Sequence, residues 1–556
     1  MFKRRCFGLG HSVVLAAAML LAACGQGGGS ASMSGTAGQS GEMVFHRGNG
    51  SEPDTLDPHL AQGNWEAHII GDLILGLTTE GPNGEAIPGA AESWDVSEDG
   101  LTWTFHLREH TWSDGVPVTS DDFVYAYRRI LNPATASNYA WYLYQIRNAT
   151  AVNSGELPGT ELGVEAPDDL TFVVHLENPA PYLAEYMTHQ TTFPVPRHLI
   201  EEVGDAWSRP GNYLSSGPYV LTEWVPNDRV TAVKNPLFYD AENVAIDRVI
   251  YYPTADYVAA LQRFRAGELD MQSVLPSVQI DWIRENLPET IDLKPILTVE
   301  YLSINFGHEE LRDLRVREAL SLALDRETIV NQIRRMGNPA AYSIVPPPIA
   351  NYPGGTELDF ANVPQPERLD RARALMEEAG YGPDNRLSIG LAVRSAAADA
   401  RRIPAAIQQM WRAIYVDAEI EQSDAAVFYN LLQEQDFDVG IAGWVADFND
   451  ASNFLELIRT GNGNNYGMYS NPEFDALLDQ AAAEQDLEVR GRILAEAESM
   501  ALRDHALIPE FFGVNRAMVQ PYLEGWVTNV NDNVRTRWLS IDEAARAARF
   551  PSRYGD

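Results

Sequence analysis

The stretch Ala91–Tyr125, AESWDVSEDGLTWTFHLREHTWSDGVPVTSDDFVY, predicts a strand, a turn and a helix in succession. Apolar and polar residues alternate from Leu101 to Leu107, and this period of two is typical of a half-buried strand. A turn-forming segment that ends at Gly115 follows. Thr119 is a good helix N-cap, and the acidic residues directly after it suit the first turn of a helix. The stretch therefore indicates a chain that mixes strands and helices.

The rest of the chain continues this mixture without a strict order. The spacing of apolar residues predicts helices at Val316–Leu324 and at Pro366–Gly380, with Gly380 at the C′ position. Strand-like runs occur at Leu170–Leu176, Tyr301–Phe306, Leu387–Val393 and Phe437–Trp444. The sequence shows no internal repeat, and it lacks the regular βαβ alternation of one doubly wound domain. The expected fold class is α/β.

The composition indicates an acidic chain that can form a substantial core. The 556 residues include 41 Lys and Arg against 78 Asp and Glu, which gives a formal net charge of −37. This length allows about two to four domains. A hydrophobic fraction of 45% with 12 Trp excludes a disordered acidic chain. Nucleic acids and anionic lipid surfaces attract basic proteins, so the charge argues against either partner.

The first residues have the features of an export signal. Lys3-Arg4-Arg5 precedes an apolar stretch that ends in Leu21-Ala22-Ala23-Cys24, so residues 1–23 are expected to be a signal peptide. Small residues before a Cys resemble the lipobox of bacterial lipoproteins, in which that Cys, here Cys24, is acylated. Residues 24–42 would then be the lipidated Cys and a flexible tether. The alternative is an ordinary cleavage site with an incidental Cys.

Export changes the charge and the expected chemistry of the mature protein. Cys6 and Cys24 are the two cysteines of the sequence, so the mature domain is expected to have neither a disulfide nor a thiol catalyst. Removal of the three basic signal residues leaves a net charge of −40. We expect an extracytoplasmic or periplasmic protein, lipid-anchored through Cys24, with the choice of inner or outer membrane left open.

One segment matches a metalloprotease motif. His106-Leu107-Arg108-Glu109-His110 has the H-x-x-E-H order of an inverted zinc-protease motif, which needs a helix so that both imidazoles reach one zinc ion. The preceding alternation predicts a strand, on which His106 and His110 would lie about 13 Å apart. We interpret the match as accidental and expect no metal site. The sequence contains no P-loop, G-x-G-x-x-G motif or G-x-S-x-G elbow, and no cofactor is expected.

Three acidic residues lie near Trp444 in the sequence: Asp438, Asp447 and Asp450. They could form the paired carboxylates of a glycosidase. They could also belong to a solvated acidic loop, which is common in a chain with 78 acids. A third interpretation is a carboxylate that pairs with a cationic group of a ligand. The residues by themselves leave these alternatives open.

Several segments resemble a known family when they are taken together and in order. Residues 91–125 are the most specific of them, and Ala442–Asn449 (AGWVADFN) is another. The others are Asn49–His59 (NGSEPDTLDPH), Asp313–Arg326 (DLRVREALSLALDR) and Ala379–Tyr381 (AGY). From about Met43 to the C-terminus, the chain resembles the solute-binding proteins of ABC-type importers in the oligopeptide/dipeptide/nickel family (family 5). Ala442–Asn449 resembles the ligand strand of the oligopeptide-binding members in particular.

The resemblance implies a two-lobed periplasmic-binding-protein fold, type II-like and closing by a hinge, with an extra third domain. Lobe I would be discontinuous, and the chain would cross between the lobes near residues 297 and 514. The implied segments are 43–74, 197–297 and 515–556 for lobe I, 75–196 for domain II and 298–514 for lobe III.

The resemblance also implies ligand-binding residues. Asp447 matches the family's carboxylate that binds the α-ammonium group of a peptide, and Gly443, Trp444 and Val445 precede it on the ligand strand. Further matches are the loop Gln62-Gly63-Asn64, the cleft residues Tyr139 and His189, and Arg401 near a region that supplies basic residues for the peptide carboxylate. Related binders can carry an acid at the position of Gln62 and an Arg at the position of Ile441, so peptide length stays open.

The function implied is an extracytoplasmic lipoprotein that binds oligopeptides and delivers them to an ABC permease. It would act as a monomer without catalysis, would not bind nucleic acid, and would contact the membrane through its lipid anchor only. One alternative is the same fold with a murein peptide, a metal chelate or another small solute such as a sugar. The other is a secreted hydrolase that uses Asp447 with Asp438 or Asp450, or His106 and His110 with zinc.

Overall fold

The structure is a computed structural model that describes residues 41–254, 256–276, 279–347, 349–354, 356–394, 402–423 and 425–555. Residues 42–556 form one compact unit. The predicted signal peptide, Cys24 and nearly all of the predicted tether lie outside the described residues, as does Arg401. No helix in the described ranges combines the length and the apolar character that crossing a membrane requires.

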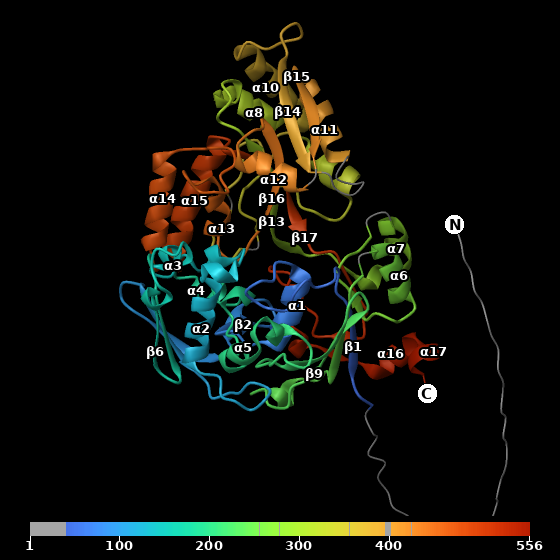
Figure 1. Cartoon of the computed structure of the whole chain (residues 1–556). Helices are drawn as coiled ribbons and strands as arrows, with labels where there is room; N and C mark the ends of the chain where they lie inside the picture. Colours follow the sequence, from blue (N-terminus) through green and yellow to red (C-terminus); the bar gives the residue numbers. More distant parts are fainter. Residues whose placement is uncertain are drawn as a thin grey trace, which may run out of the picture. The chain divides into compact units, whose positions relative to one another are not determined.

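A seven-stranded sheet unites three separate parts of the chain (Figure 1). In spatial order its strands are β12 (Ile291–Asp292), β18 (Ala517–Val519), β11 (Met271–Gln272), β1 (Val44–Gly48), β10 (Arg248–Tyr252), β9 (Arg229–Lys234) and β8 (Tyr219–Val225). The first strand of the chain lies inside this sheet and pairs in parallel with β10 and β11. The helices from the same parts of the chain are α1 (Asn64–Leu73), α5 (Arg197–Val203), α6 (Tyr257–Arg265), α7 (Ile280–Asn286), α16 (Glu543–Arg549) and α17 (Pro551–Tyr554).

Residues 91–125 supply two of the four strands of a second, antiparallel sheet. Its strands are β4 (Ala91–Val96), β5 (Thr102–Leu107), β7 (Thr171–His175) and β6 (Val164–Asp168). The predicted strands at 101–107 and 170–176 are confirmed. Helix α2 (Ser120–Ile130) begins after Thr119, whose backbone N–H donates to Asp122 at 3.0 Å, as in a capping box. Short elements nearby are α3 (Ala149–Asn153), α4 (Leu183–Tyr186) and the hairpin β2 (Thr78–Glu80) and β3 (Ala86–Pro88).

The later half of the chain builds a five-stranded sheet. Its order is β15 (Val416–Ser423), β14 (Leu387–Arg394), β16 (Val439–Val445), β13 (Pro295–Ile304) and β17 (Leu507–Val514). The predicted strands in this half are confirmed, although β13 starts six residues before the expected Tyr301. Both predicted helices are present, and Gly380 follows the C-cap with φ +97°. The helices are α8 (Leu314–Ala323), α9 (Arg326–Thr328), α10 (Gln365–Glu378), α11 (Arg402–Arg412), α12 (Ala425–Gln433), α13 (Ser452–Leu455), α14 (Pro472–Ala483) and α15 (Leu487–Arg503).

The chain passes twice between the seven-stranded and five-stranded sheets. One passage joins β12 to β13 and the other joins β17 to β18. The two passages are hydrogen-bonded to each other: the Lys294 N–H donates to the Asn515 side chain at 2.8 Å, and the Asn515 N–H donates to the Lys294 carbonyl at 3.0 Å. These positions lie within three residues of the predicted crossings at 297 and 514.

Buried apolar residues form two large clusters that respect the same division. One cluster consists of residues between Leu297 and Phe512. The other draws on residues 45–251, Met271 and residues 517–541. One large cluster therefore belongs to residues 297–512, and the other combines the seven-stranded and the four-stranded sheets. The exact segment boundaries stay a prediction.

Candidate functional site

The last residues of β16 form an open sheet edge. On one side, β16 pairs with β13 along its whole length, from Val439 to Val445. On the other side it pairs with β14 only at Val439 and Gly440. Beyond Gly440, no strand among the described residues borders this second edge. A strand that ends in this way can accept another extended chain.

The hydrogen bonds of β16 show which groups face the open edge. The Ala446 N–H donates to the Leu297 carbonyl at 2.8 Å, and the Asn305 N–H donates to the Asp438 carbonyl at 3.0 Å. Even-numbered residues of the strand therefore direct their main-chain groups at β13, because these directions alternate along an antiparallel strand. The main-chain groups of Gly443 and Val445 consequently face the open edge. Val445 is 58% exposed.

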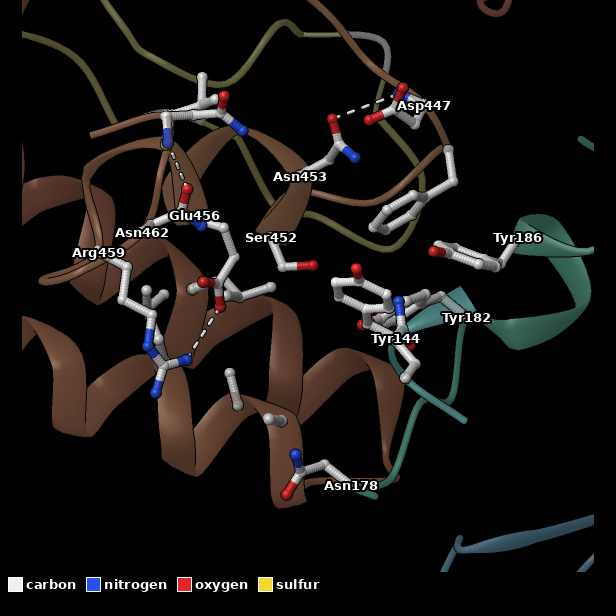
Figure 2. A pocket seen from close by; sticks show the side chains of 18 of the residues that line it. Tyr144, Asn178, Tyr182, Tyr186, Asp447, Ser452, Asn453, Glu456, Arg459 and Asn462 are labelled. Atoms are coloured by element: carbon white, nitrogen blue, oxygen red, sulfur yellow. Dashed lines mark hydrogen bonds and ion pairs between the residues drawn. The ribbon is translucent and has the colours of Figure 1, made fainter. Parts of the chain in front are cut away.

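The open edge leads to the carboxylate of Asp447. The Asn453 side-chain oxygen accepts from the Asp447 backbone N–H at 3.4 Å (Figure 2). The same oxygen accepts from the Trp444 indole N–H at 2.6 Å, so Asn453 holds the turn after β16. The Asp447 side chain is half-buried and forms no ion pair with a described residue. Burial raises its pKa to about 6, although a hydrogen bond from Asn453 acts in the opposite direction. An unpaired, desolvated carboxylate is suited to binding a cation.

Aromatic residues of the predicted domain II contact this turn. The Tyr142 hydroxyl donates to the Asp447 carbonyl at 3.3 Å. Tyr182 stacks on Phe448 with 4.8 Å between ring centroids. His189 stacks on Tyr142 at 4.6 Å and on Tyr139 at 5.5 Å. Burial lowers the pKa of His189 to about 3, so this imidazole is neutral at pH 7.

Glu66 organises the loop Gln62-Gly63-Asn64 at the start of α1. Its carboxylate accepts the backbone N–H groups of Gln62 at 3.0 Å and Gly63 at 2.8 Å. It also accepts the N–H groups of Asp54 at 2.8 Å and Thr55 at 3.2 Å. Glu66 is the third residue after the N-cap Gly63, which is the capping-box position. One buried acid therefore fixes the whole loop.

Asp447 lines three hollows. The smallest, which we call the inner hollow, has a volume of about 170 Å³. It brings together six of the predicted residues: Gln62, Asn64, Tyr139, His189, Val445 and Asp447. Its remaining lining residues include His68, Glu80, Thr188, Asn531, Asp532 and Asn533. Gly63 is next to two lining residues in the sequence, and Gly443 is two residues before a third, but neither glycine lines the inner hollow. Arg401 lies outside the described residues.

The other two hollows lie against Trp444. One has a volume of about 470 Å³ and is also lined by Tyr139 and Val445. The second, of about 460 Å³, is shown in Figure 2, with Tyr182 and Tyr186 on one side and Glu456 and Asn462 on the other. Asp447, which follows the open edge of β16, thus lines all three hollows.

The groups proposed for a hydrolase have other partners. Asp450 is ion-paired with Arg490, and Asp438 accepts the Gly390 N–H at 2.7 Å and pairs with His308 at 2.9 Å. His106 lies on β5 and pairs with Asp95 at 2.8 Å. The ring of His110 bonds to the Arg108 carbonyl at 3.0 Å. In the described part of the chain, no three His, Cys, Asp or Glu residues are grouped to hold a metal ion.

Sequence reasoning missed several residues of this site. Glu66 could have been found from its capping-box position. Asn453 and Tyr142 carry no pattern that predicts their contacts with the turn after β16. Asp532 belongs to a different part of the chain from Asp447 and reaches the inner hollow through the fold alone.

Comparisons with known proteins show the family of this chain. The model of the bacterial extracellular solute-binding proteins, family 5 Middle, matches residues 85–466. The periplasmic oligopeptide-binding protein OppA of Salmonella typhimurium is 35% identical over 509 residues, covering 90% of this chain and 93% of the relative.

Solved structures of relatives match over nearly their whole length. Haemophilus influenzae OppA, in complex with the peptide RPPGFSPFR, has a TM-score of 0.74 at 33% identity and covers 90% of this chain and 99% of its own. The unliganded open form of the periplasmic murein tripeptide binding protein MppA has a TM-score of 0.81 at 30% identity, with coverage of 90% and 98%. The chain belongs to the bacterial extracellular solute-binding proteins of family 5 and has their two-lobed α/β fold with a third domain.

Proposed function

We propose that this protein binds extended oligopeptides along the open edge of β16 and delivers them to an ABC-type importer. The observation that carries the proposal is the arrangement of one edge and one acid. Main-chain groups of Gly443 and Val445 face an unpaired edge, and that edge leads to the unpaired carboxylate of Asp447. Relatives at 35% identity are named as oligopeptide-binding proteins, which supports this reading.

The two features would divide the work of recognition. Main-chain hydrogen bonds to an added strand give affinity without reading side chains. A charge-assisted contact between Asp447 and the peptide α-ammonium would fix the register. Glycine at position 443 leaves room for the Glu300 side chain of the neighbouring strand β13, since a Cβ there would lie 2.7 Å from the Glu300 carboxylate.

Ligand binding would be coupled to closure of the lobes. Tyr139 and His189 come from the predicted domain II, Gln62 from lobe I and Asp447 from lobe III. A ligand that contacts all of them binds the closed form more tightly than the open form and so shifts the population. The paired passages at Lys294 and Asn515 are the proposed hinge, and the permease would recognise the closed form.

We extend the proposal to the location of the protein. Its relatives are periplasmic binding proteins, and the signal-like N-terminus agrees with export. Acylation of Cys24 would anchor the domain to a membrane through lipid alone. The protein would act there as a monomer and without catalysis. Labelling with a radioactive fatty acid, compared between the wild type and Cys24→Ala, measures the anchor directly.

A murein peptide is the second candidate ligand. The relative MppA, named as a murein tripeptide binding protein, matches at 30% identity. A murein peptide can share with an oligopeptide the backbone groups and the amine that the site would bind. Mass spectrometry of ligand that co-purifies with the protein separates the two. Peptides of mixed sequence support the oligopeptide proposal, and a single murein fragment supports the second candidate.

The first test removes the proposed amine-binding carboxylate. Asp447→Ala is expected to weaken binding of free-amine peptides roughly 10- to 100-fold, because a hydrogen bond to a charged group contributes about 1.5–3 kcal/mol. Binding of the same peptides with an acetylated amino terminus should stay unchanged. Isothermal titration calorimetry measures both. Equal losses for both ligand classes would contradict amine binding by Asp447.

A second test addresses the open edge. Val445→Pro removes an N–H group that faces away from β13, so the sheet is expected to tolerate it. Loss of one main-chain donor should weaken free-amine and acetylated peptides alike, by roughly two- to tenfold. Val445→Ala keeps the N–H group and serves as the matched control. Unchanged affinity in Val445→Pro would rule out strand addition at this residue.

A further inference from the structure

The described lining residues of the inner hollow include acids but no Lys or Arg. Glu80, Asp447 and Asp532 are among its lining residues, and no described Lys or Arg lines it. Its two histidines are neutral at pH 7, because burial holds the pKa of His189 at about 3 and that of His68 well below its usual value. The described walls therefore contain no positive charge.

The charge of Glu80 is already neutralised by Arg535, which does not line the inner hollow. Its carboxylate pairs with the guanidinium of Arg535 through two bonds of 2.8 Å, and both side chains are almost fully buried. It also accepts from the Asn533 amide at 2.6 Å. Glu80 is therefore a framework residue, and Asp447 and Asp532 are the acids left for a ligand.

Asp532 is a second acid, besides Asp447, that lines the inner hollow without an ion pair to a described residue. It belongs to the C-terminal part of the chain, whereas Asp447 follows the ligand strand. The Asp532 carboxylate forms no hydrogen bond or ion pair with any described residue, although its carbonyl contacts the His68 ring at 3.3 Å. Burial raises its pKa to about 7; the positive charges of Arg47 and Arg516 oppose this rise without cancelling it, and the negative charge of Asp292 adds to it.

We propose that Asp532 is a second ligand-binding carboxylate. Asp447 would bind the α-ammonium group of the peptide, and Asp532 would bind a Lys or Arg side chain of the same peptide. The inference rests on the proposed function and adds a preference for basic side chains near the amino terminus. Gln62 of the predicted loop also lines the inner hollow and is uncharged. Glu80 is paired with Arg535, so Asp532 is the acid available besides Asp447 among the described lining residues.

The preference follows from the cost of leaving a carboxylate unpaired. Asp532 is partly exposed when no ligand is bound, so some water still reaches this residue. Closure around a peptide removes that water, and an ionised carboxylate without a partner is then strongly disfavoured. A basic side chain supplies the missing charge and a charge-assisted hydrogen bond. When the peptide carries an apolar side chain, Asp532 must take up a proton instead, which costs free energy. The site therefore discriminates between basic and apolar peptides by the difference between these two binding free energies.

The test compares matched peptides on matched variants. The peptides are variants of tetra-alanine in which one of the first three residues is replaced. The replacement is either Lys or norleucine, whose uncharged side chain has a similar length. For the wild-type full chain at pH 7.5, we expect Lys at one position to bind about tenfold more tightly than norleucine. Asp532→Asn should abolish this preference and keep the discrimination between free and acetylated amino termini. Asn suits the left-handed backbone at this position, where φ is +55°, so the fold should tolerate it.

The controls separate this inference from the proposed function. Asp384→Asn removes one charge from an exposed position outside the inner hollow and should leave the preference intact. Asp447→Asn should lose amine discrimination and keep the Lys preference. A Lys preference that persists in Asp532→Asn, or a wild type with none at any position, overturns the role of Asp532 alone. A wild type that binds no peptide overturns the proposed function.

Discussion

Asp447 and Asp450 lie three residues apart in the segment after β16, yet their surroundings differ completely. Asp450 is buried, with its side chain 2% exposed, and it pairs with the equally buried Arg490 at 2.5 and 2.9 Å. It also accepts the Ser452 N–H at 2.9 Å. Asp447 is half-buried, has no ion pair among the described residues, and lines all three hollows at the end of β16. Asp450 supports the fold, and Asp447 is the acid that we propose binds the ligand.

The same contrast extends across the molecule. Some buried framework carboxylates pair with arginine, as in Asp57 with Arg129 at 2.6 Å and Asp270 with Arg546 at 3.2 Å. A planar guanidinium can donate two parallel bonds to a carboxylate, which lysine cannot. This gives a structural use to part of the strong excess of Arg over Lys in the sequence. The acids of the inner hollow that lack such a partner are the ones assigned to the ligand.

The largest expected effect comes from breaking the framework pair. Asp450→Asn leaves the Arg490 guanidinium buried without a counter-charge, and this should lower the free energy of unfolding by about 3–5 kcal/mol. Urea denaturation at pH 7 measures the change. Glu488→Gln, which breaks the exposed pair with Arg492, is the matched control and should cost less than about 1 kcal/mol.

A double variant tests whether the loss is due to the unpaired charge. Asp450→Asn combined with Arg490→Met removes both charges, and most of the stability should return. If the double variant is as unstable as Asp450→Asn, packing around Ser452 explains the loss. The ion pair with Arg490 would then not be what distinguishes Asp450 from Asp447.

A smaller effect is expected from the pH dependence of peptide binding by Asp447. With a ligand-free pKa of about 6, Asp447 loses its charge as the pH falls from 7 to 5. The affinity for a free-amine peptide without basic side chains should therefore fall about tenfold over this range, and that of its acetylated form should not. Calorimetric titrations at the two pH values measure this. The same fall in Asp447→Asn would assign the effect to another group, such as Asp532.

The sequence predicts the framework well because periodicity reports local burial. The strand at 101–107, the N-cap Thr119 and the helix that ends before Gly380 follow from patterns over a few residues. The family resemblance adds Asp447 and its neighbours on the ligand strand. These predictions share one property: each depends on residues that are close together in the chain or on a motif that can be read in order.

The remaining parts of the site depend on contacts between distant segments. Nothing near Asp450 in the sequence shows that Arg490 neutralises it, and nothing near Asp532 shows that it faces the hollow of Asp447. The open edge of β16 likewise depends on where β14 stops pairing, at Gly440. Whether an acid is paired, and with what, is a property of the tertiary structure, so composition and spacing do not reveal it.

The smallest effect should have the opposite sign to that of Asp450→Asn. Asp447 has a pKa of about 6 in the folded protein against 3.8 for an ordinary Asp, so the folded state holds its proton more tightly than the unfolded state. The stability of the ligand-free protein therefore falls as the pH rises between about 4 and 6, and the full penalty is present at pH 7.

Asp447→Asn removes this penalty. The ligand-free variant should be more stable than the wild type at pH 7 by about 1 kcal/mol, a value reduced for the partial contact of the carboxylate with water. At pH 4 the difference should vanish, since the wild-type group is then protonated in the folded state. Urea denaturation at both pH values measures this. A loss of stability at pH 7 would place Asp447 among the framework acids with Asp450, because a residue that serves only the ligand has no stabilising partner to lose.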